Sequence, residues 1–188
     1  MTPAPVSRST ACAAPRGRRA FTLIELVAVI VVLGILAATA APALANMQRG
    51  REAALAREAE RRVELAAATA LSTTLPTGVR FDATTQTMTL VEIVSSGAAP
   101  TTVLPSIGAK YPELPVGTVF SGTSITTVDL ADAGAPDTIW FDYEAAPHTR
   151  DADGTNPVAL TRDAVITFSG GDTLTIHKTT GLIERGLP

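Results

Sequence analysis

The sequence predicts an α+β fold in which a long N-terminal helix packs on an antiparallel β-sheet domain. Three observations lead to this prediction. Residues 21–45 are a nearly uninterrupted apolar run, residues 46–71 repeat apolar side chains every three or four positions, and from Gly78 onward the repeat shortens to two positions. A helix followed by a succession of antiparallel strands is the α+β arrangement, with the helix laid across one face of a sheet.

Residues 1–20 are predicted to be a cytoplasmic leader that takes no part in the fold. Prolines and small residues dominate this segment, and it carries four arginines and no acid. Arg16, Arg18 and Arg19 directly precede the apolar run, so the positive-inside rule places the N-terminus in the cytoplasm and the rest of the chain outside.

Residues 21–45 are predicted to be a transmembrane helix. These 25 residues contain one charge, Glu25, and otherwise only Thr22 and Thr39 are polar. As a helix the segment is about 37 Å long, enough to cross a hydrocarbon core of about 30 Å. A carboxylate inside a span costs about 2.5–3.5 kcal/mol on insertion scales, so it normally has a partner or a purpose. Glu25 is therefore a candidate functional residue.

Residues 46–71 are predicted to continue the helix as an amphipathic segment. Its apolar stripe is made mostly of alanine, which suits close packing under a sheet: Leu55, Ala59, Val63, Ala67 and Ala70. A coiled coil is the alternative, but the segment has fewer than four regular heptads. Pro42, just upstream, removes a backbone donor and is expected to kink the continuous helix. Ser72, Thr73, Thr74 and Pro76 are expected to end it.

Residues 72–188 are predicted to be a β-rich globular domain. The expected strands are 79–82, 87–94, 101–104, 117–120, 125–130, 138–143, 164–168 and 173–177, with a short tail at 182–184. Gly170 and Gly171 mark a hairpin between the last two strands. In that hairpin Ala164, Ile166 and Phe168 are expected to share the buried face with Leu174 and Ile176. Residues 105–116 and 144–157 are expected to be irregular surface.

Charge and cysteine content restrict the possible functions. The formal net charge is −3, but from Leu71 to the C-terminus six Lys or Arg face thirteen Asp or Glu, giving −7. Such a domain is a poor nonspecific ligand for nucleic acid, whose binding depends on phosphate neutralisation. The single cysteine, Cys12, lies in the leader, so the exported part has no disulfide and no thiolate metal site.

No catalytic motif stands out, and no cofactor is expected. His148 and His177 are 29 residues apart and are interpreted as surface or strand residues, because a zinc site needs at least three ligands. Asp151, Asp153 and Asn156 form a weak candidate for a calcium loop; an Asp/Gly/Asn turn is the alternative. Trp140, with Phe141 and Tyr143, is expected to pack in the core.

The segment RRAFTLIELVAVIVVLGILAATAAP resembles the class III signal of type IV pilins and type II secretion pseudopilins. This resemblance implies cleavage by prepilin peptidase between Ala20 and Phe21, N-methylation of Phe21, and assembly roles for Glu25 and Pro42. It also implies that other pilins or pseudopilins and an inner-membrane assembly platform are partners. The family prefers Gly before the cut, where this chain has Ala20.

The second half of the chain resembles the minor pseudopilin H group and related minor pilins. The residues that carry this resemblance are LPVG at 114–117 and TLTIHKTTGLI at 173–183. Many major pilins close a C-terminal loop with a disulfide, so a cysteine-free domain favours a minor subunit. The implied function is that of a non-enzymatic minor pseudopilin, single-pass in the inner membrane with a periplasmic domain.

Two alternatives stay open. The chain could be a minor type IV pilin that acts in pilus assembly, adhesion or DNA uptake, although the acidic domain argues against a nucleic-acid partner. Residues 43–45 also read as an A-x-A-like site before Asn46, so the apolar run could be an ordinary secretory signal. In that case the product would be a secreted β domain. The position at which the N-terminus is cut distinguishes this secreted product from a pilin-like subunit.

Overall fold

The computed structural model describes residues 21–95, 98–102, 113–130 and 137–187. The chain divides into two compact units, residues 1–42 and 43–188, and each is described by itself. The predicted leader at 1–20 lies outside the described residues. So do residues 103–104 of an expected strand and most of the expected irregular segment at 105–116.

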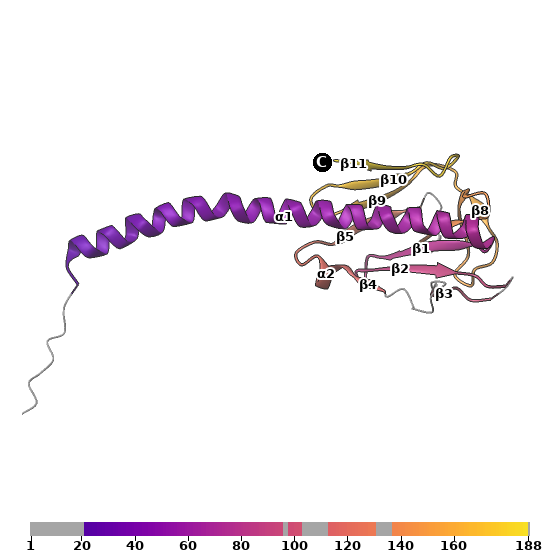
Figure 1. Ribbon diagram of the computed structural model, residues 1–188, viewed down its shortest axis with the longest axis horizontal. Helices are drawn as coiled ribbons and strands as arrows, with labels where there is room; N and C mark the ends of the chain where they lie inside the picture. Colours follow the sequence, from indigo (N-terminus) through magenta and orange to yellow (C-terminus); the bar gives the residue numbers. More distant parts are fainter. Residues whose placement is uncertain (1–20, 96–97, 103–112, 131–136, 188) are drawn as a thin grey trace, which may run out of the picture. The chain divides into compact units, whose positions relative to one another are not determined.

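A single helix, α1 (Leu23–Thr73), contains both the apolar run and the amphipathic segment, as the periodicity predicts (Figure 1). Pro42 lies inside α1, and the helix is continuous across it. The expected kink at Pro42 stays a prediction. The helix ends two residues beyond the predicted Leu71, where Thr74 takes a positive φ of 59° and Pro76 follows.

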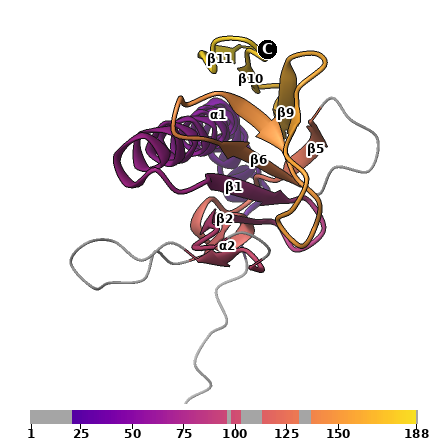
Figure 2. The same cartoon turned by 90° about the vertical axis from the view of Figure 1, so that its right-hand side faces the viewer.

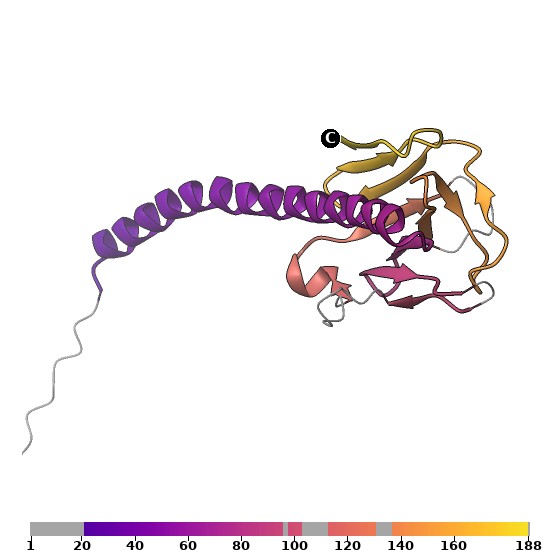
Figure 3. The ribbon, with the colours of Figure 1, turned by 45° about the vertical axis from the view of Figure 1, so that its right-hand side comes forward.

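The globular unit contains two antiparallel sheets rather than the one expected. The larger has the order β3-β2-β1-β6-β7-β8, with β4 also paired to β2, and the smaller has the order β11-β10-β9-β5. Figures 1 and 3 show β9–β11 along one flank of the domain part of α1 and β1–β2 along the other. The strands of the larger sheet are β1 (Thr77–Asp82), β2 (Thr87–Glu92), β3 (Thr101–Thr102), β4 (Leu114–Pro115), β6 (Thr138–Phe141), β7 (Pro147–Thr149) and β8 (Val158–Ala159). Those of the smaller are β5 (Ile125–Asp129), β9 (Ala164–Phe168), β10 (Thr173–Ile176) and β11 (Ile183–Gly186).

The main core lies between α1 and the inner faces of both sheets (Figure 2). The helix contributes Leu55, Ala56, Ala59, Val63, Ala66 and Ala70, all fully buried. Ala67 of the predicted stripe is only partly buried, and Ala66 lies deeper. Because the stripe is mostly alanine, the sheets supply the large side chains: Phe81, Ile139, Phe141, Ile166, Phe168, Leu174 and Ile176.

The predicted β9–β10 hairpin is confirmed. Leu174 pairs with Ile166, and Ala164, Ile166, Phe168, Leu174 and Ile176 are the buried members of the two strands. Gly170 and Gly171 take φ values of +90° and +92°, which only glycine adopts without strain, and this turn joins the strands.

Residues 117–120 form no strand, contrary to expectation. Residues 117–119 belong to a single helical turn, α2 (Val116–Val119), which directly follows β4, and Phe120 is its C-cap. Val116 is fully buried and Phe120 packs against the core. Apolar residues four positions apart lie on one face of a helix and on one face of a strand alike, so the short segment was ambiguous.

The aromatic cluster was predicted only in part. Phe141 lies in the main core, but Trp140 points to the opposite face of the larger sheet, where it is buried with Val91 and Ile93. Gly78 pairs with Trp140, and a Cβ on Gly78 would meet the indole ring at 3.0 Å. Tyr143 is 61% exposed, so its expected burial is wrong; it follows the end of β6 and leaves the core.

Candidate processing and assembly site

Phe21 is the first described residue and lies just before α1. Its side chain is 80% exposed. Ala20, the residue expected before the cut, lies outside the described residues. Phe21 lies on the mature side of the expected cleavage point, and the described residues leave it largely uncovered.

Glu25 and Thr22 close the N-terminus of α1 with a reciprocal pair of hydrogen bonds. The Glu25 amide donates to Thr22 Oγ1 at 3.3 Å, and the Thr22 amide donates to Glu25 Oε2 at 2.9 Å. The Thr22 hydroxyl donates to the same Oε2 at 3.0 Å. This arrangement is a capping box, which satisfies two amides that the first turn of a helix leaves without partners. A carboxylate at this helix end also interacts favourably with the helix dipole.

The second carboxylate oxygen of Glu25, Oε1, accepts no hydrogen bond from the described residues. One oxygen of Glu25 thus serves its own helix, and the other is available to a donor from elsewhere. The N-terminal cap therefore leaves Oε1 of Glu25 available to the partner that a charge in a membrane span normally has.

The first unit presents apolar side chains around the whole helix. Leu23, Ile24, Leu26, Ile30, Leu33, Ile35 and Leu36 are all more than half exposed. α1 is the one candidate membrane span among the described residues, and its most apolar window is wholly unburied. Such a surface needs lipid or other apolar helices around it, because an all-round apolar helix is stable only when covered. Pro42 lies within α1.

The calcium-loop candidate lies in the connection between β7 and β8. Asn156 Nδ2 donates to Asp151 Oδ2 at 2.6 Å, so these two side chains meet. Asp153 instead accepts from the amide and hydroxyl of Thr155 at 3.0 and 2.7 Å. These hydrogen bonds hold the pKa of Asp153 below its usual value. In the described part of the chain, no group of three His, Cys, Asp or Glu side chains is arranged to hold a metal ion.

The two histidines have different surroundings. His177 follows β10 and lies between Asp163 Oδ2 at 3.1 Å and Glu184 Oε2 at 3.3 Å, on opposite sides of its ring. His148 lies in β7, is 7% exposed, and contacts the Ala146 carbonyl and the guanidinium of Arg150. The two carboxylates beside His177 were not predicted, because β9 and β11 bring them together from distant positions.

Sequence reasoning missed two further features of this chain. The T-x-x-E spacing of Thr22 and Glu25 was a readable capping-box signal, but Glu25 was interpreted only as a charge in a membrane. The pair of His148 and Arg150 was missed because residues 144–157 were expected to be irregular. His148 lies in β7 and Arg150 directly follows that strand, and side chains two residues apart in extended backbone share a face.

A comparison with known protein families matches the N-terminal segment of the chain. Residues 15–41 match the family described as the Prokaryotic N-terminal methylation motif. The match includes Ala20, Phe21 and Glu25 and ends one residue before Pro42. No curated protein matches the chain, and no solved structure does. The motif implies processing by prepilin peptidase and assembly with other pilins. The chain thus carries a class III prepilin signal at residues 15–41, consistent with a type IV pilin-like protein.

Proposed function

We propose that this chain is a non-enzymatic minor pseudopilin of a type II secretion pseudopilus. Prepilin peptidase cuts between Ala20 and Phe21 and methylates the new N-terminus. The mature subunit spans the inner membrane once, with its β-rich domain in the periplasm, until the assembly platform transfers it into the filament. The observation that carries the proposal is the exposed apolar part of α1, most of which lies within the matched methylation motif.

Assembly is proposed to proceed through the N-terminal helix. Exchanging lipid for apolar helices of neighbouring subunits costs little, because both surround the helix with hydrocarbon. Glu25 sets the axial register when its Oε1 accepts from the Phe21 amine of an adjacent subunit. That oxygen has no donor among the described residues of its own chain, whereas Oε2 is used by Thr22.

A minor type IV pilin is the second candidate, and the same motif favours it equally. Within that class, the negative charge of the β-rich domain favours a role in assembly or adhesion over one in DNA uptake. The domain from Leu71 onward carries −7, which repels the phosphate backbone.

Mass spectrometry of the membrane-bound protein tests the proposal. The expected product begins at N-methylated Phe21. A product that begins at Asn46 would establish a secretory signal and would remove the pilin-like function. The matched variant is Ala20→Gly, which restores the residue preferred before the cut. We expect this variant to be cut at the same bond and at least as fast.

A further inference from the structure

Two neighbouring cavities open at the end of the domain where α1 stops and β1 begins. The first has a volume of about 480 Å³, and the second of about 470 Å³. Both are lined by Pro76, Arg150 and Pro157, so the Arg150 side chain lies at their common wall. Each is within the size range of pockets that hold small ligands or the end of a peptide.

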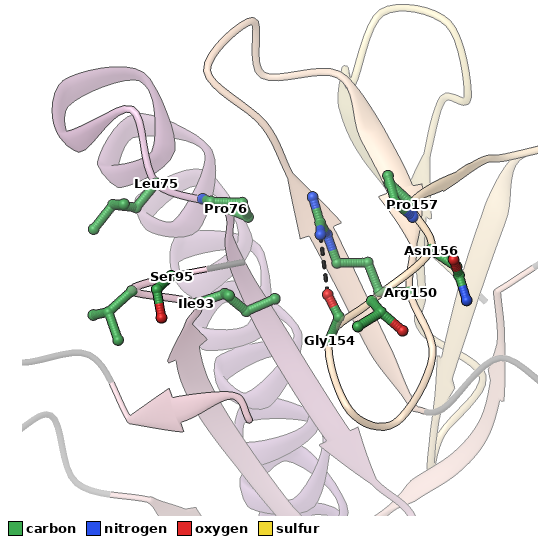
Figure 4. Close-up of a pocket in the computed structure, with 10 residues that line it drawn as sticks. Leu75, Pro76, Ile93, Ser95, Arg150, Gly154, Asn156 and Pro157 are labelled. Atoms are coloured by element: carbon green, nitrogen blue, oxygen red, sulfur yellow. Dashed lines mark hydrogen bonds between the residues drawn. The ribbon is translucent and has the colours of Figure 1, made fainter. Parts of the chain in front are cut away.

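Arg150 is held in place by two hydrogen bonds. Its Nε donates to His148 Nε2 at 2.9 Å, and its Nη1 donates to the Gly154 carbonyl at 3.0 Å. The remaining nitrogen, Nη2, donates to no described residue. Figure 4 shows the bond to Gly154 and places Leu75, Pro76, Ile93 and Ser95 across the first cavity from Arg150. A fixed guanidinium with unused donors is suited to a carboxylate, and fixing it beforehand lowers the entropy cost of binding.

The loop that supports Arg150 is closely packed and hydrogen-bonded. Gly154 has a φ of +81°, and a Cβ at this position would lie 2.8 Å from Ile93 Cδ1. The Gly154 amide also donates to the Asp151 carbonyl at 2.8 Å, and the Asp151 amide donates to the Thr155 carbonyl at 3.0 Å. The loop first considered as a calcium site therefore forms a wall of the first cavity and orients Arg150.

The charge distribution selects the kind of anion. Arg150 is the only charged residue among the described residues that line the first cavity, whereas Asp142 lines the second and attracts the guanidinium from that side. An anion in the first cavity therefore meets the guanidinium without a carboxylate in the described lining. The domain from Leu71 onward carries −7, so a polyanion is repelled while a single carboxylate is tolerated.

The rest of the lining fits a peptide end. Leu75, Pro76, Ile93 and Val94 form an apolar wall for a side chain. Ser95 and Asn156 lie at the same cavity, and neither Ser95 Oγ nor Asn156 Oδ1 is bonded to a described residue, so both can accept from a peptide amide. A free carboxylate, a peptide amide and an apolar last side chain occur together at the C-terminus of a polypeptide.

We infer that the first cavity binds the C-terminal carboxylate of a polypeptide with an apolar last residue, with Arg150 as its anchor. This inference goes beyond the proposed function and does not depend on filament assembly. It gives the domain a recognition site for the end of another chain.

The test measures peptide binding to the full-length chain in detergent micelles by fluorescence polarisation. The probe is a labelled hexapeptide that ends in Ala-Leu with a free carboxylate, and the comparison is the same peptide amidated at its C-terminus. We expect amidation and Arg150→Gln each to weaken binding by about tenfold or more, as expected for loss of a charged hydrogen bond. Arg57→Gln removes an exposed charge of α1 and should leave binding unchanged.

Arg150→Gln leaves His148 and Gly154 without their hydrogen-bond donor and could lose binding through misfolding alone. A second variant therefore tests the cavity without removing Arg150. Val94 is 53% exposed and makes no bond to Arg150, so Val94→Trp fills the first cavity and leaves the Arg150 bonds intact. We expect Val94→Trp to abolish peptide binding. Equal binding of the acid and amide peptides would overturn the inference, as would unchanged binding by Val94→Trp. Tighter binding of acetate or inorganic phosphate than of the peptide would overturn it too, by showing a simple anion site.

Discussion

Glu25 and Thr22 cap the same helix end from opposite directions, with the Glu25 amide on Thr22 Oγ1 and the Thr22 amide on Glu25 Oε2. Glu25 therefore has two separable roles, as a cap within its own chain and as the proposed acceptor for the Phe21 amine of a neighbour. Because a capping box accepts Gln as well as Glu at this position, Glu25→Gln retains the cap and removes the charge. Thr22→Ala removes the capping hydroxyl and keeps the charge of Glu25. The loss of the hydroxyl costs about 1 kcal/mol of helix stability.

We expect Glu25→Gln and Glu25→Leu to insert and to be cut normally, but to be absent from the filament. The unpaired amine in an apolar core costs several kcal/mol. Thr22→Ala should enter the filament. The measurement is co-purification of each mature variant with sheared filaments. Incorporation of Glu25→Leu at the wild-type level would contradict the pairing, and failure of Thr22→Ala would assign the requirement to the cap.

The sequence predicted those parts of the fold in which a pattern repeats often enough to be read. α1 combines an apolar run over residues 21–45 with a repeat of three or four over residues 46–71, and the β9–β10 hairpin combines alternation with a Gly170–Gly171 turn. β7 and β8 have three and two residues, too few to show alternation, so the sheet edge that carries His148 and Arg150 was missed. The split into two sheets depends on long-range pairings, such as Gly78 with Trp140, that no local pattern encodes.

The fragment 48–188 is expected to fold without the span. It retains the buried helix residues from Leu55 to Ala70 and both sheets, and residues 43–188 form a compact unit. Circular dichroism should show a mixed α+β spectrum with one cooperative thermal transition. Added calcium should leave that transition unchanged, because Asp151 and Asp153 already accept hydrogen bonds from Asn156 and Thr155. A rise in the melting temperature with calcium but not magnesium would show that the loop is a calcium site.

Leu55 is the largest helix side chain in the main core and is fully buried. Leu55→Ala should lower the free energy of unfolding by about 2–5 kcal/mol, because the alanines around it cannot fill the cavity. Leu71→Ala is the matched control, since Leu71 is 53% exposed, and should change stability by less than about 0.5 kcal/mol. Urea unfolding followed by the fluorescence of Trp140, the only tryptophan, measures both. Equal effects would show that α1 does not cover the sheets in solution.

Burial lowers the pKa of His148 from its usual value, so the folded protein holds this ring neutral with Nε2 accepting from Arg150. The unfolded chain takes up the proton first as the pH falls below about 6.5. The stability that His148 contributes is therefore present above that pH and is lost as the pH falls through the lowered folded pKa. Trp140 pairs with His148 across β6 and β7 and reports on this region. Thermal unfolding should show a smaller acid-side loss in His148→Gln than in the wild type.

His177 should respond to pH with the opposite sign. The hydrogen bond from its ring to Glu184 is the main cause that raises its pKa, and the charge of Asp163 adds to it. The folded protein therefore retains the proton at a pH where the unfolded chain has lost it. The stability that His177 contributes is fully present below about pH 6.5, the unfolded value, and is lost as the pH rises through the raised folded pKa.

The pH range over which the charged His177 contributes stability also has a lower limit. The amide of Lys178 is the main cause that lowers the pKa of Asp163, and the imidazolium of His177 adds to it, so this carboxylate stays ionised below its usual value near 3.8. Between the two limits the ring joins β10 to β11 through Glu184 and to the start of β9 through Asp163.

His177→Gln should therefore lower the melting temperature at pH 5.5 and have little effect at pH 8.5. The matched control is Lys178→Gln, which keeps the backbone amide on Asp163 and should show no such pH dependence. A His177→Gln effect that is equal at both pH values would show that the ring acts as a neutral hydrogen-bonding group and that no ion pair forms.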